Sequence, residues 1–186
     1  MTIPLSTLHR HVGMGGDKYV AAVAGDEVEE KIGEELRRRW EQIFGELLPE
    51  IVPLPGARRL LAELKRHGLT VVLASSSIQQ HLDPFLDLLE AREVVDGWTM
   101  KDDVEASKPE PDLVVAALEK AGTREAFVVG DTTWDVEAAA KSDQPTVCVL
   151  TGGFSRAELE EAGAKAVYGS PGELADDLHG LLGRLA

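Results

Sequence analysis

The chain has 186 residues and a mass of 20.1 kDa, enough for one full hydrophobic core with a small accessory module beside it. Its 33 Asp and Glu residues against 19 Lys and Arg give a net charge of −14, which would repel a nucleic-acid backbone over most of the surface. The single cysteine, Cys148, excludes an internal disulfide, and no apolar run approaches the roughly 18 residues that a membrane span needs. We therefore expect a cytoplasmic protein with neither nucleic-acid nor membrane partners, in which Cys148 is a buried and inert thiol.

The first 52 residues are expected to form a helical module. Residues 17–24 and 26–48 are strongly charged, follow a helical pattern and contain no convincing strand. Residues 13–16 form a glycine-rich, flexible loop that leads to Asp17 as a helix N-cap. The Pro-rich stretch at residues 53–56 then separates this module, residues 1–52, from residues 53–186.

From Gly56 onward, short β-rich apolar runs alternate with amphipathic helical stretches. The predicted strands are residues 69–74, 126–129, 146–150 and, more weakly, 166–168. The predicted helices are residues 57–67, 111–121 and 171–185. This order is typical of parallel strands joined by helical crossovers, so we predict an α/β fold.

Polar residues follow these strands at the end of the sheet where ligands bind in such folds. Ser75, Ser76 and Ser77 could cradle a phosphoryl oxygen, although serines are also common in turns and caps. Asp131 and Asp135 lie one helical turn apart, and their hard oxygen atoms suit Mg²⁺. The alternative is that Asp131 caps a helix and that Asp135, in the first turn, interacts favourably with the helix dipole.

The order Ser75, then Lys108 in the loop before Pro109, then Asp131 and Asp135 resembles the haloacid dehalogenase superfamily of phosphohydrolases. Residues 71–77, 107–112 and 128–135 correspond to its second, third and fourth motifs, and the resemblance continues through residues 151–154. Residues 3–50 resemble the helical cap that phosphoglycolate-phosphatase-like members insert after the first motif. The resemblance implies a Rossmann-like parallel sheet with helices on both faces, plus a small all-helical cap.

The resemblance also assigns roles. Ser75, with Ser76, would hydrogen-bond the transferring phosphoryl group, and Lys108 would neutralise it and help to position the nucleophile. Asp131 would hold Mg²⁺, and Asp135 would complete the outer shell of the metal. These roles agree with the needs of phosphoryl transfer, which are in-line positioning and charge neutralisation.

The cap loop at residues 11–18, including Gly15 and Lys18, would by the same resemblance close over the substrate, a small phosphorylated metabolite. The sequence identifies neither that metabolite nor the oligomeric state.

The chain departs from the family at the first motif, which supplies an Asp nucleophile and a second Asp two positions later. No Asp-x-Asp-Gly segment follows an apolar strand here. In the family this strand lies mid-sheet, between the strands that end at Ser75 and Asp131. We therefore predict that the first, central strand is absent and that the chain as written is inactive.

Three explanations stay open for this departure. The first is that the chain is a shortened form of a longer one. The second is that the protein has lost its catalytic activity and serves as a binding or regulatory protein. The third is that residues 1–5 or a partner supply the strand, although Pro4 disfavours a central position.

Other functions are compatible with parts of the pattern. A sugar-phosphate mutase of the same superfamily would share these motifs. A response-regulator receiver domain fits poorly, because it begins with its acidic strand and places its Lys after later strands. A true dehalogenase works without metal and lacks the Gly-Asp pair at residues 130–131. The five histidines show no zinc-ligand spacing and are expected at the surface, and Trp40 and Trp98 are expected to be packing residues.

Overall fold

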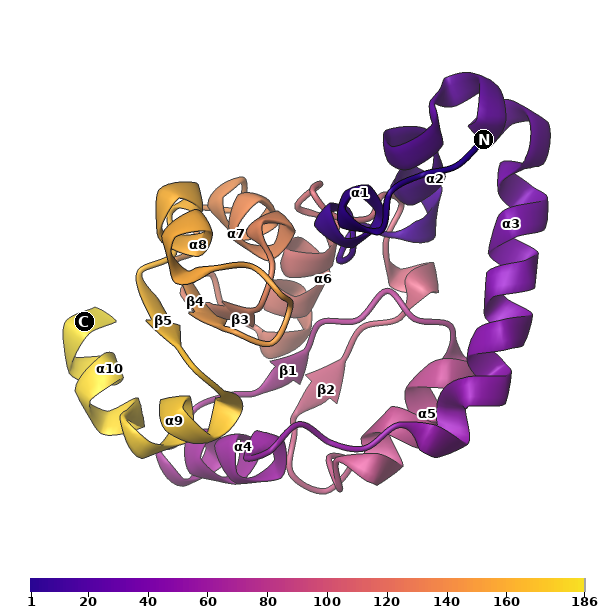
Figure 1. Ribbon diagram of the computed structural model, residues 1–186. Coiled ribbons are helices and arrows are strands. Elements are labelled where there is room, and N and C mark those ends of the chain that lie inside the picture. Colours follow the sequence, from indigo (N-terminus) through magenta and orange to yellow (C-terminus); the bar gives the residue numbers. More distant parts are fainter. Residues whose placement is uncertain (186) are drawn as a thin grey trace.

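The computed structural model describes residues 1–185, and its N-terminal part contains only helices (Figure 1). These are α1 (Leu5–Arg10), α2 (Gly16–Ala24), α3 (Asp26–Leu47) and the short 3₁₀ turn η1 (Leu48–Glu50). Gly25, with φ of 90°, separates α2 from α3, and acids in the first turn of α3 favour the helix dipole. The two longer helices confirm the prediction, whereas α1 was missed because it is short and lacks a side-chain cap.

The rest of the chain alternates helices and strands as predicted. Its elements are α4 (Ala57–Arg66), β1 (Val72–Leu73), α5 (Gln79–Leu88), β2 (Gly97–Trp98), η2 (Lys101–Asp103), α6 (Asp112–Ala121), β3 (Val128–Gly130), α7 (Thr133–Ala140), β4 (Thr146–Val149), α8 (Arg156–Ala162), β5 (Ala166–Tyr168), α9 (Pro171–Asp176) and α10 (Leu178–Leu185).

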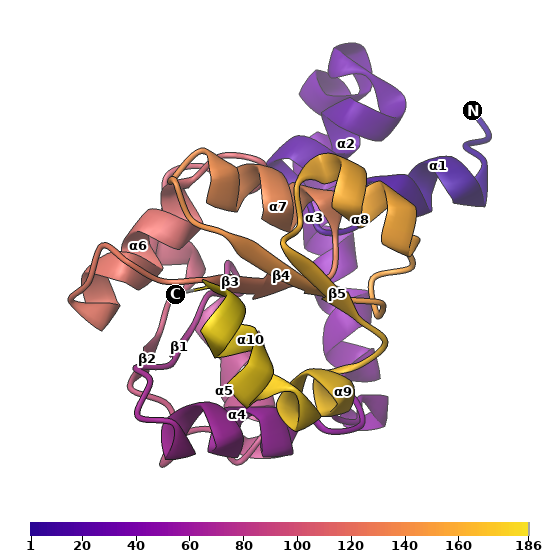
Figure 2. The same cartoon turned by 90° about the vertical axis from the view of Figure 1, so that its left-hand side faces the viewer.

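All strand pairs are parallel, but they form two separate sheets. One has the order β1-β2 and the other β3-β4-β5. Figure 2 shows α7 and α8 on one face of the three-stranded sheet and α9 and α10 on the other. The predicted α/β class, with helices on both faces of a parallel sheet, is thus confirmed. Among the described residues, no strand pairs with the second edge of β1 or of β3.

Two predicted elements differ from those observed. The strand expected at residues 69–74 shortens to β1, because the backbone N–H of Val71 donates to a side-chain oxygen of Asp96 (2.7 Å) instead of to a strand. The helix expected at residues 171–185 divides into α9 and α10 at Asp177, whose carboxylate accepts hydrogen bonds from Tyr168 (2.8 Å) and Arg184 (2.6 Å). β2 was missed because two residues are too few to show a periodic pattern.

The core lies between the sheets and the helices of residues 53–185. Its fully buried side chains include Leu86, Val147 and Leu174, and Trp98 packs against them as expected. Cys148 is also fully buried, and desolvation raises its pKa to about 12. None of the helices formed by residues 1–185 has both the length and the hydrophobicity to cross a membrane.

Trp40 stacks on the ring of Phe44 (4.8 Å between centroids), although it stays 57% exposed. The expectation that the histidines all lie at the surface was wrong. His81 is 5% exposed, because it lies on the inner face of α5, where its ring meets that of Phe44 edge-on (5.0 Å between centroids).

Candidate functional site

Asp131 and Asp135 are placed by the junction between β3 and α7. Asp131 directly follows β3, and Thr132 is the N-cap of α7. The hydroxyl of Thr132 accepts from the backbone N–H of Asp135 (3.2 Å) and donates to the Asp135 carboxylate (2.7 Å). The backbone N–H of Thr132 donates to the same carboxylate (3.0 Å), which completes a capping box. Asp135 is thereby fixed in one orientation.

Lys108 forms a partly buried ion pair with Asp135. Its Nζ donates to Asp135 Oδ1 (2.8 Å), and the two side chains are only 22% and 12% exposed. The other oxygen, Oδ2, also accepts from the backbone N–H of Asp131 (3.1 Å). Burial works to raise the pKa of Asp135, but the charge of Lys108 and these hydrogen bonds outweigh it, so the net pKa is lowered. Asp135 therefore uses both oxygens within the protein.

Asp131 is held in place by a hydrogen bond from a residue that follows a second strand, β4. Its Oδ2 accepts a hydrogen bond from the hydroxyl of Thr151 (2.7 Å), which lies just beyond β4. Burial raises the pKa of Asp131; the Thr151 bond acts against this, and the nearby charge of Asp135 adds to it. A Cβ on Gly152 would overlap the Asp131 carbonyl oxygen, so this close approach requires glycine. Sequence reasoning missed Thr151, although the strand-end rule, applied to residues 146–150, would have found it.

The serine loop, residues 75–77, lies at the end of the other sheet. The hydroxyl of Thr99 accepts from the backbone N–H of Ser75 and donates to its carbonyl oxygen, both at 2.9 Å. The backbone N–H of Ser77 donates to Ser75 Oγ (3.1 Å), and all three serines are half-buried. Thr99 is fully buried and was missed, because it follows the unrecognised strand β2.

The structure brings Lys108, Asp131 and Asp135 into one hydrogen-bonded network. Ser75 stands apart from it, since no hydrogen bond joins Ser75 to these three residues within residues 1–185.

The glycine loop of the N-terminal module reaches the loop that carries Lys108. The Asp17 carboxylate accepts a hydrogen bond from the Ser107 hydroxyl, next to Lys108. A Cβ on Gly15 would overlap the Ser107 side chain, so only glycine allows this approach. Lys18 is half-exposed, and its side chain makes no hydrogen bond or ion pair within the described part of the chain.

A second set of contacts joins the N-terminal module to α7 and α8. Trp134 Nε1 donates to the carbonyl oxygen of Arg10 (3.1 Å), and the His11 ring stacks on Trp134 (6.1 Å between centroids). The Arg10 guanidinium forms an ion pair with Glu158 (2.6 Å) and lies over the Phe154 ring. Both sets of contacts flank the network of Lys108, Asp131 and Asp135.

The residues of this network could supply only some of the ligands that Mg²⁺ needs. Mg²⁺ is usually bound by one or two carboxylates, with water and phosphate oxygens completing its shell. Asp131 Oδ1 takes part in no hydrogen bond among the described residues, so it is the carboxylate oxygen available to a cation. Nowhere in residues 1–185 do three or more acidic, histidine or cysteine side chains gather as metal ligands. Water and phosphate oxygens would supply the remaining ligands.

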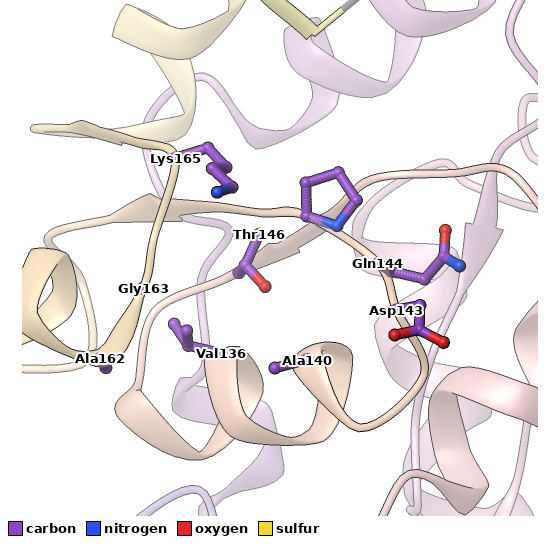
Figure 3. Close-up of a pocket in the computed structure, with 9 residues that line it drawn as sticks. Val136, Ala140, Asp143, Gln144, Thr146, Ala162, Gly163 and Lys165 are labelled. Atoms are coloured by element: carbon purple, nitrogen blue, oxygen red, sulfur yellow. The ribbon is translucent and has the colours of Figure 1, made fainter.

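A separate pocket of about 310 Å³ lies at the end of the sheet where β4 begins (Figure 3). Its lining includes Pro145 and Thr146, at the start of β4, together with Val136, Ala140 and Lys165. Because β3 and β4 are parallel, the start of β4 lies away from the end of β3 that carries Asp131. The pocket is therefore distinct from the candidate site.

Comparison with known proteins relates this geometry to one family. Residues 2–149 match the family model of haloacid dehalogenase-like hydrolases. A crystal structure of a hydrolase from Pseudomonas syringae is similar at 31% identity, with a TM-score of 0.88 over 97% of this chain and 84% of that one. A β-phosphoglucomutase from Clostridium difficile shares the fold, with a TM-score of 0.81 at 15% identity over all of this chain and 83% of that one.

Among curated relatives, the phosphoglycolate phosphatase of Pseudomonas putida is 26% identical over 96% of this chain and 65% of its own length. A haloacid dehalogenase-like hydrolase domain-containing protein of Arabidopsis thaliana is 32% identical over 63% of this chain and 38% of its own length. The chain thus spans less than two thirds of the length of either relative. The family model covers most of the chain, from residue 2 to residue 149. The chain belongs to the haloacid dehalogenase-like hydrolase family.

Proposed function

We propose that this chain is the larger part of a Mg²⁺-dependent phosphomonoester hydrolase that acts through an aspartyl-phosphate. The observation that carries the proposal is the network in which Lys108, Asp131 and Asp135 lie at the end of β3 with one Asp131 oxygen free for a cation. A partly buried site at a strand end that combines a lysine with a carboxylate oxygen for a cation suits a phosphoryl group that must be neutralised during transfer.

Each residue of the site has a defined part in the proposal. Ser75 and Ser76 hydrogen-bond the phosphoryl oxygens, and Thr99 keeps their loop in place. Lys108 neutralises phosphoryl charge, and Asp135 positions Lys108. Asp131 would hold Mg²⁺, which neutralises further charge on the phosphoryl group when bound.

Residues 1–52 act in this proposal as a cap over residues 53–186, and the substrate is a small phosphorylated metabolite. The contacts of Gly15 and Asp17 with Ser107 support a cap loop that closes beside the phosphoryl position, with Lys18 turned to the substrate. The one cysteine is buried, which accords with a reducing, cytoplasmic compartment.

The nucleophile belongs, in this proposal, to a strand upstream of Met1. Among residues 1–185, nothing pairs with the second edge of β1 or of β3, and this supports a strand between them, because unpaired backbone groups inside a core destabilise a fold. Such a strand, ending in Asp-x-Asp, would bring its first carboxylate to the same end of the sheet as Asp131, where the parallel strands end. The first Asp attacks phosphorus to form the aspartyl-phosphate, and the second gives a proton to the leaving oxygen. Water then attacks the phosphorus of this intermediate and gives a proton to the carboxylate of the second Asp, while the bond between phosphorus and the first Asp breaks. Phosphate is released and both Asp residues return to their starting states.

The test compares two forms with p-nitrophenyl phosphate in Mg²⁺: the 186-residue chain and a chain extended by the reading frame upstream of Met1. We expect turnover from the extended form alone, and equal activity of both forms would refute the proposal. In the extended form, Asp131→Ala should reduce kcat at least about 10²-fold. Glu161→Ala, an exposed change on α8, is the matched control and should leave kcat unchanged.

A different outcome would point to another function. An extended chain that binds phosphate and Mg²⁺ without turnover would favour a binding or regulatory protein, and transfer of the phosphoryl group to a sugar phosphate would favour a mutase.

A further inference from the structure

The pocket at the start of β4 contains a buried hydroxyl group without a partner. Thr146 is 2% exposed, and its Oγ1 makes no hydrogen bond among residues 1–185. Nearby carbonyl oxygens already accept backbone hydrogen bonds: that of Thr146 from Lys165 (2.8 Å), and that of Pro145 from Val128 (2.9 Å). A buried polar group that stays unpaired destabilises a fold, so this hydroxyl requires a partner from outside the chain.

The hydroxyl faces the space between the sheet and two helices. Side chains alternate along a strand, so Thr146 points to the same face of the sheet as Cys148, and Lys165 to the same face as Val167. On that face, Cys148 and Val167 pack with Val136 of α7. The pocket therefore lies under α7 and α8, beside the first residues of β4 and β5.

Both helices end at the pocket. Ala140 is the last residue of α7 and Ala162 the last of α8, and both line the pocket together with Val136 and Pro145. The last carbonyl groups of a helix lack an intrahelical partner and carry partial negative charge. This part of the pocket therefore suits a cationic group beside an apolar one.

Two opposite charges also line the pocket. Asp143 and Lys165 are exposed, and neither side chain forms an ion pair or a hydrogen bond within the part of the chain that the structure describes. By contrast, the neighbouring Lys141 pairs with Glu137 (3.2 Å). In Figure 3, Asp143 and Lys165 lie on opposite sides of Thr146. An anion and a cation that line one cavity without contacting each other favour a ligand that carries both charges.

The remaining polar residue of the lining, Gln144, is already bonded within the protein. Its Oε1 accepts from the backbone N–H of Ala126 (2.9 Å), and its Nε2 donates to the carbonyl oxygens of Arg124 (3.1 Å) and Ser142 (2.9 Å). These bonds fix the loop that carries Asp143. The pocket is therefore formed before a ligand arrives, as most small-molecule sites are.

We propose that this pocket binds a free α-amino acid with an aliphatic side chain, in its zwitterionic form. The carboxylate pairs with Lys165 and accepts a hydrogen bond from Thr146. The ammonium group pairs with Asp143 and faces the end of α7, and the aliphatic side chain packs against Val136 and Pro145. The volume of about 310 Å³ is at the lower end for ligand pockets, which fits a ligand of this size.

Other small ligands fit this lining less well. A phosphate ion would meet Asp143 and the ends of two helices, all of which repel an anion. A divalent cation needs several oxygen ligands, whereas Asp143 is the one carboxylate of the lining and Lys165 would repel the metal. The proposed site does not depend on the proposed function, because the pocket is distinct from the candidate site.

A heteronuclear NMR titration of the 186-residue chain with L-leucine tests the proposal. We expect a Kd of about 1 mM or below, with shifts of the amide signals of residues 140–146 and 162–165. Isocaproate lacks the amino group of leucine, and isoamylamine lacks its carboxylate. Each should bind at least about tenfold more weakly, because each leaves one charge of the pocket without a partner.

Three variants place the ligand. Thr146→Val keeps the side-chain shape and should weaken binding at least about tenfold, while the melting temperature without ligand stays the same or rises because an unpaired hydroxyl is gone. Asp143→Asn, in which Asn tolerates the φ of 56°, and Lys165→Met should each weaken binding about tenfold or more. Glu161→Gln, an exposed change on α8 outside the lining, is the matched control and should leave the Kd unchanged.

Three results would overturn the inference. One is the absence of amide shifts with L-leucine at about 10 mM, far above the expected Kd, which would make this a water-filled pocket. Another is equal affinity for leucine and its two analogues. The third is unchanged affinity in the pocket variants with shifts around Asp131, which would place the ligand at the candidate site.

Discussion

Replacing Lys108 by Met removes the cation that faces Asp135 while keeping most of the side-chain volume. The side chain of Asp135 is only 12% exposed, so water can take the place of the ammonium group only in part. Three hydrogen bonds remain, from the backbone N–H groups of Asp131 and Thr132 and from the Thr132 hydroxyl. The variant therefore has a buried, partly solvated anion without a counter-charge.

The size of the effect follows from this geometry. Removing one partner of a fully buried ion pair costs about 3–5 kcal/mol. Because Lys108 is 22% exposed and Asp135 keeps its three hydrogen bonds, we expect the free energy of unfolding to fall by about 2 kcal/mol. Lys120→Met is the matched control. Its ion pair with Asp103 is longer (3.4 Å) and more exposed, so the loss should stay below about 0.5 kcal/mol.

Urea unfolding followed by tryptophan fluorescence measures these changes, and a double-mutant cycle with Asp135→Asn isolates the pair. We expect a coupling energy of about 1–2 kcal/mol between the two positions. A loss for Lys108→Met no larger than that of the control, or additive effects in the cycle, would refute the assigned ion pair.

The sign of the pH dependence gives a second check. The folded pKa of Asp135 is lowered from 3.8, so its ionisation contributes stability above that value, and this contribution is lost as pH falls through the folded pKa. Without Lys108, the pKa of Asp135 is lowered less, because the charge and the hydrogen bond that oppose burial most strongly are gone. The difference in stability between wild type and Lys108→Met should therefore be largest near neutral pH and shrink below pH 3.8. A difference that grows on acidification would contradict this account.

Three other predictions follow from single contacts. Desolvation raises the pKa of Cys148 to about 12, so iodoacetamide at pH 8 should label it at the unfolding rate, and labelling as fast as free cysteine would contradict its burial. Gly152→Ala should destabilise by about 1–3 kcal/mol in thermal unfolding, because its Cβ would overlap the Asp131 carbonyl oxygen, whereas Gly183→Ala, with open space around it, should not. Thr99→Val removes two hydrogen bonds of the serine loop and should cost about 1–3 kcal/mol by urea unfolding, and an unchanged midpoint would exclude its supporting role.

Local patterns were enough to predict much of this fold. The helices α2 and α3, the alternation after Gly56 and the strand expected at residues 146–150 came from periodicity and apolar runs, which reflect contacts close in sequence. The same local reasoning placed Asp131 and Asp135 one turn apart after a strand. It failed where an element is short, as at α1 and β2, and where a histidine is buried against an aromatic ring, as at His81.

The sequence alone determined the class of fold and placed Ser75 and Asp131 after strands, because these depend on spacing within a segment, and the resemblance of its motifs indicated the family. Only the tertiary structure decided which side chains support them. Thr151 reaches Asp131 across 20 residues, Thr99 reaches Ser75 across 24, and Asp17 reaches Ser107 across 90. It also decided that the parallel strands form two separate sheets. Such pairings depend on how distant segments pack, and a periodic pattern within one segment contains no information about these long-range contacts.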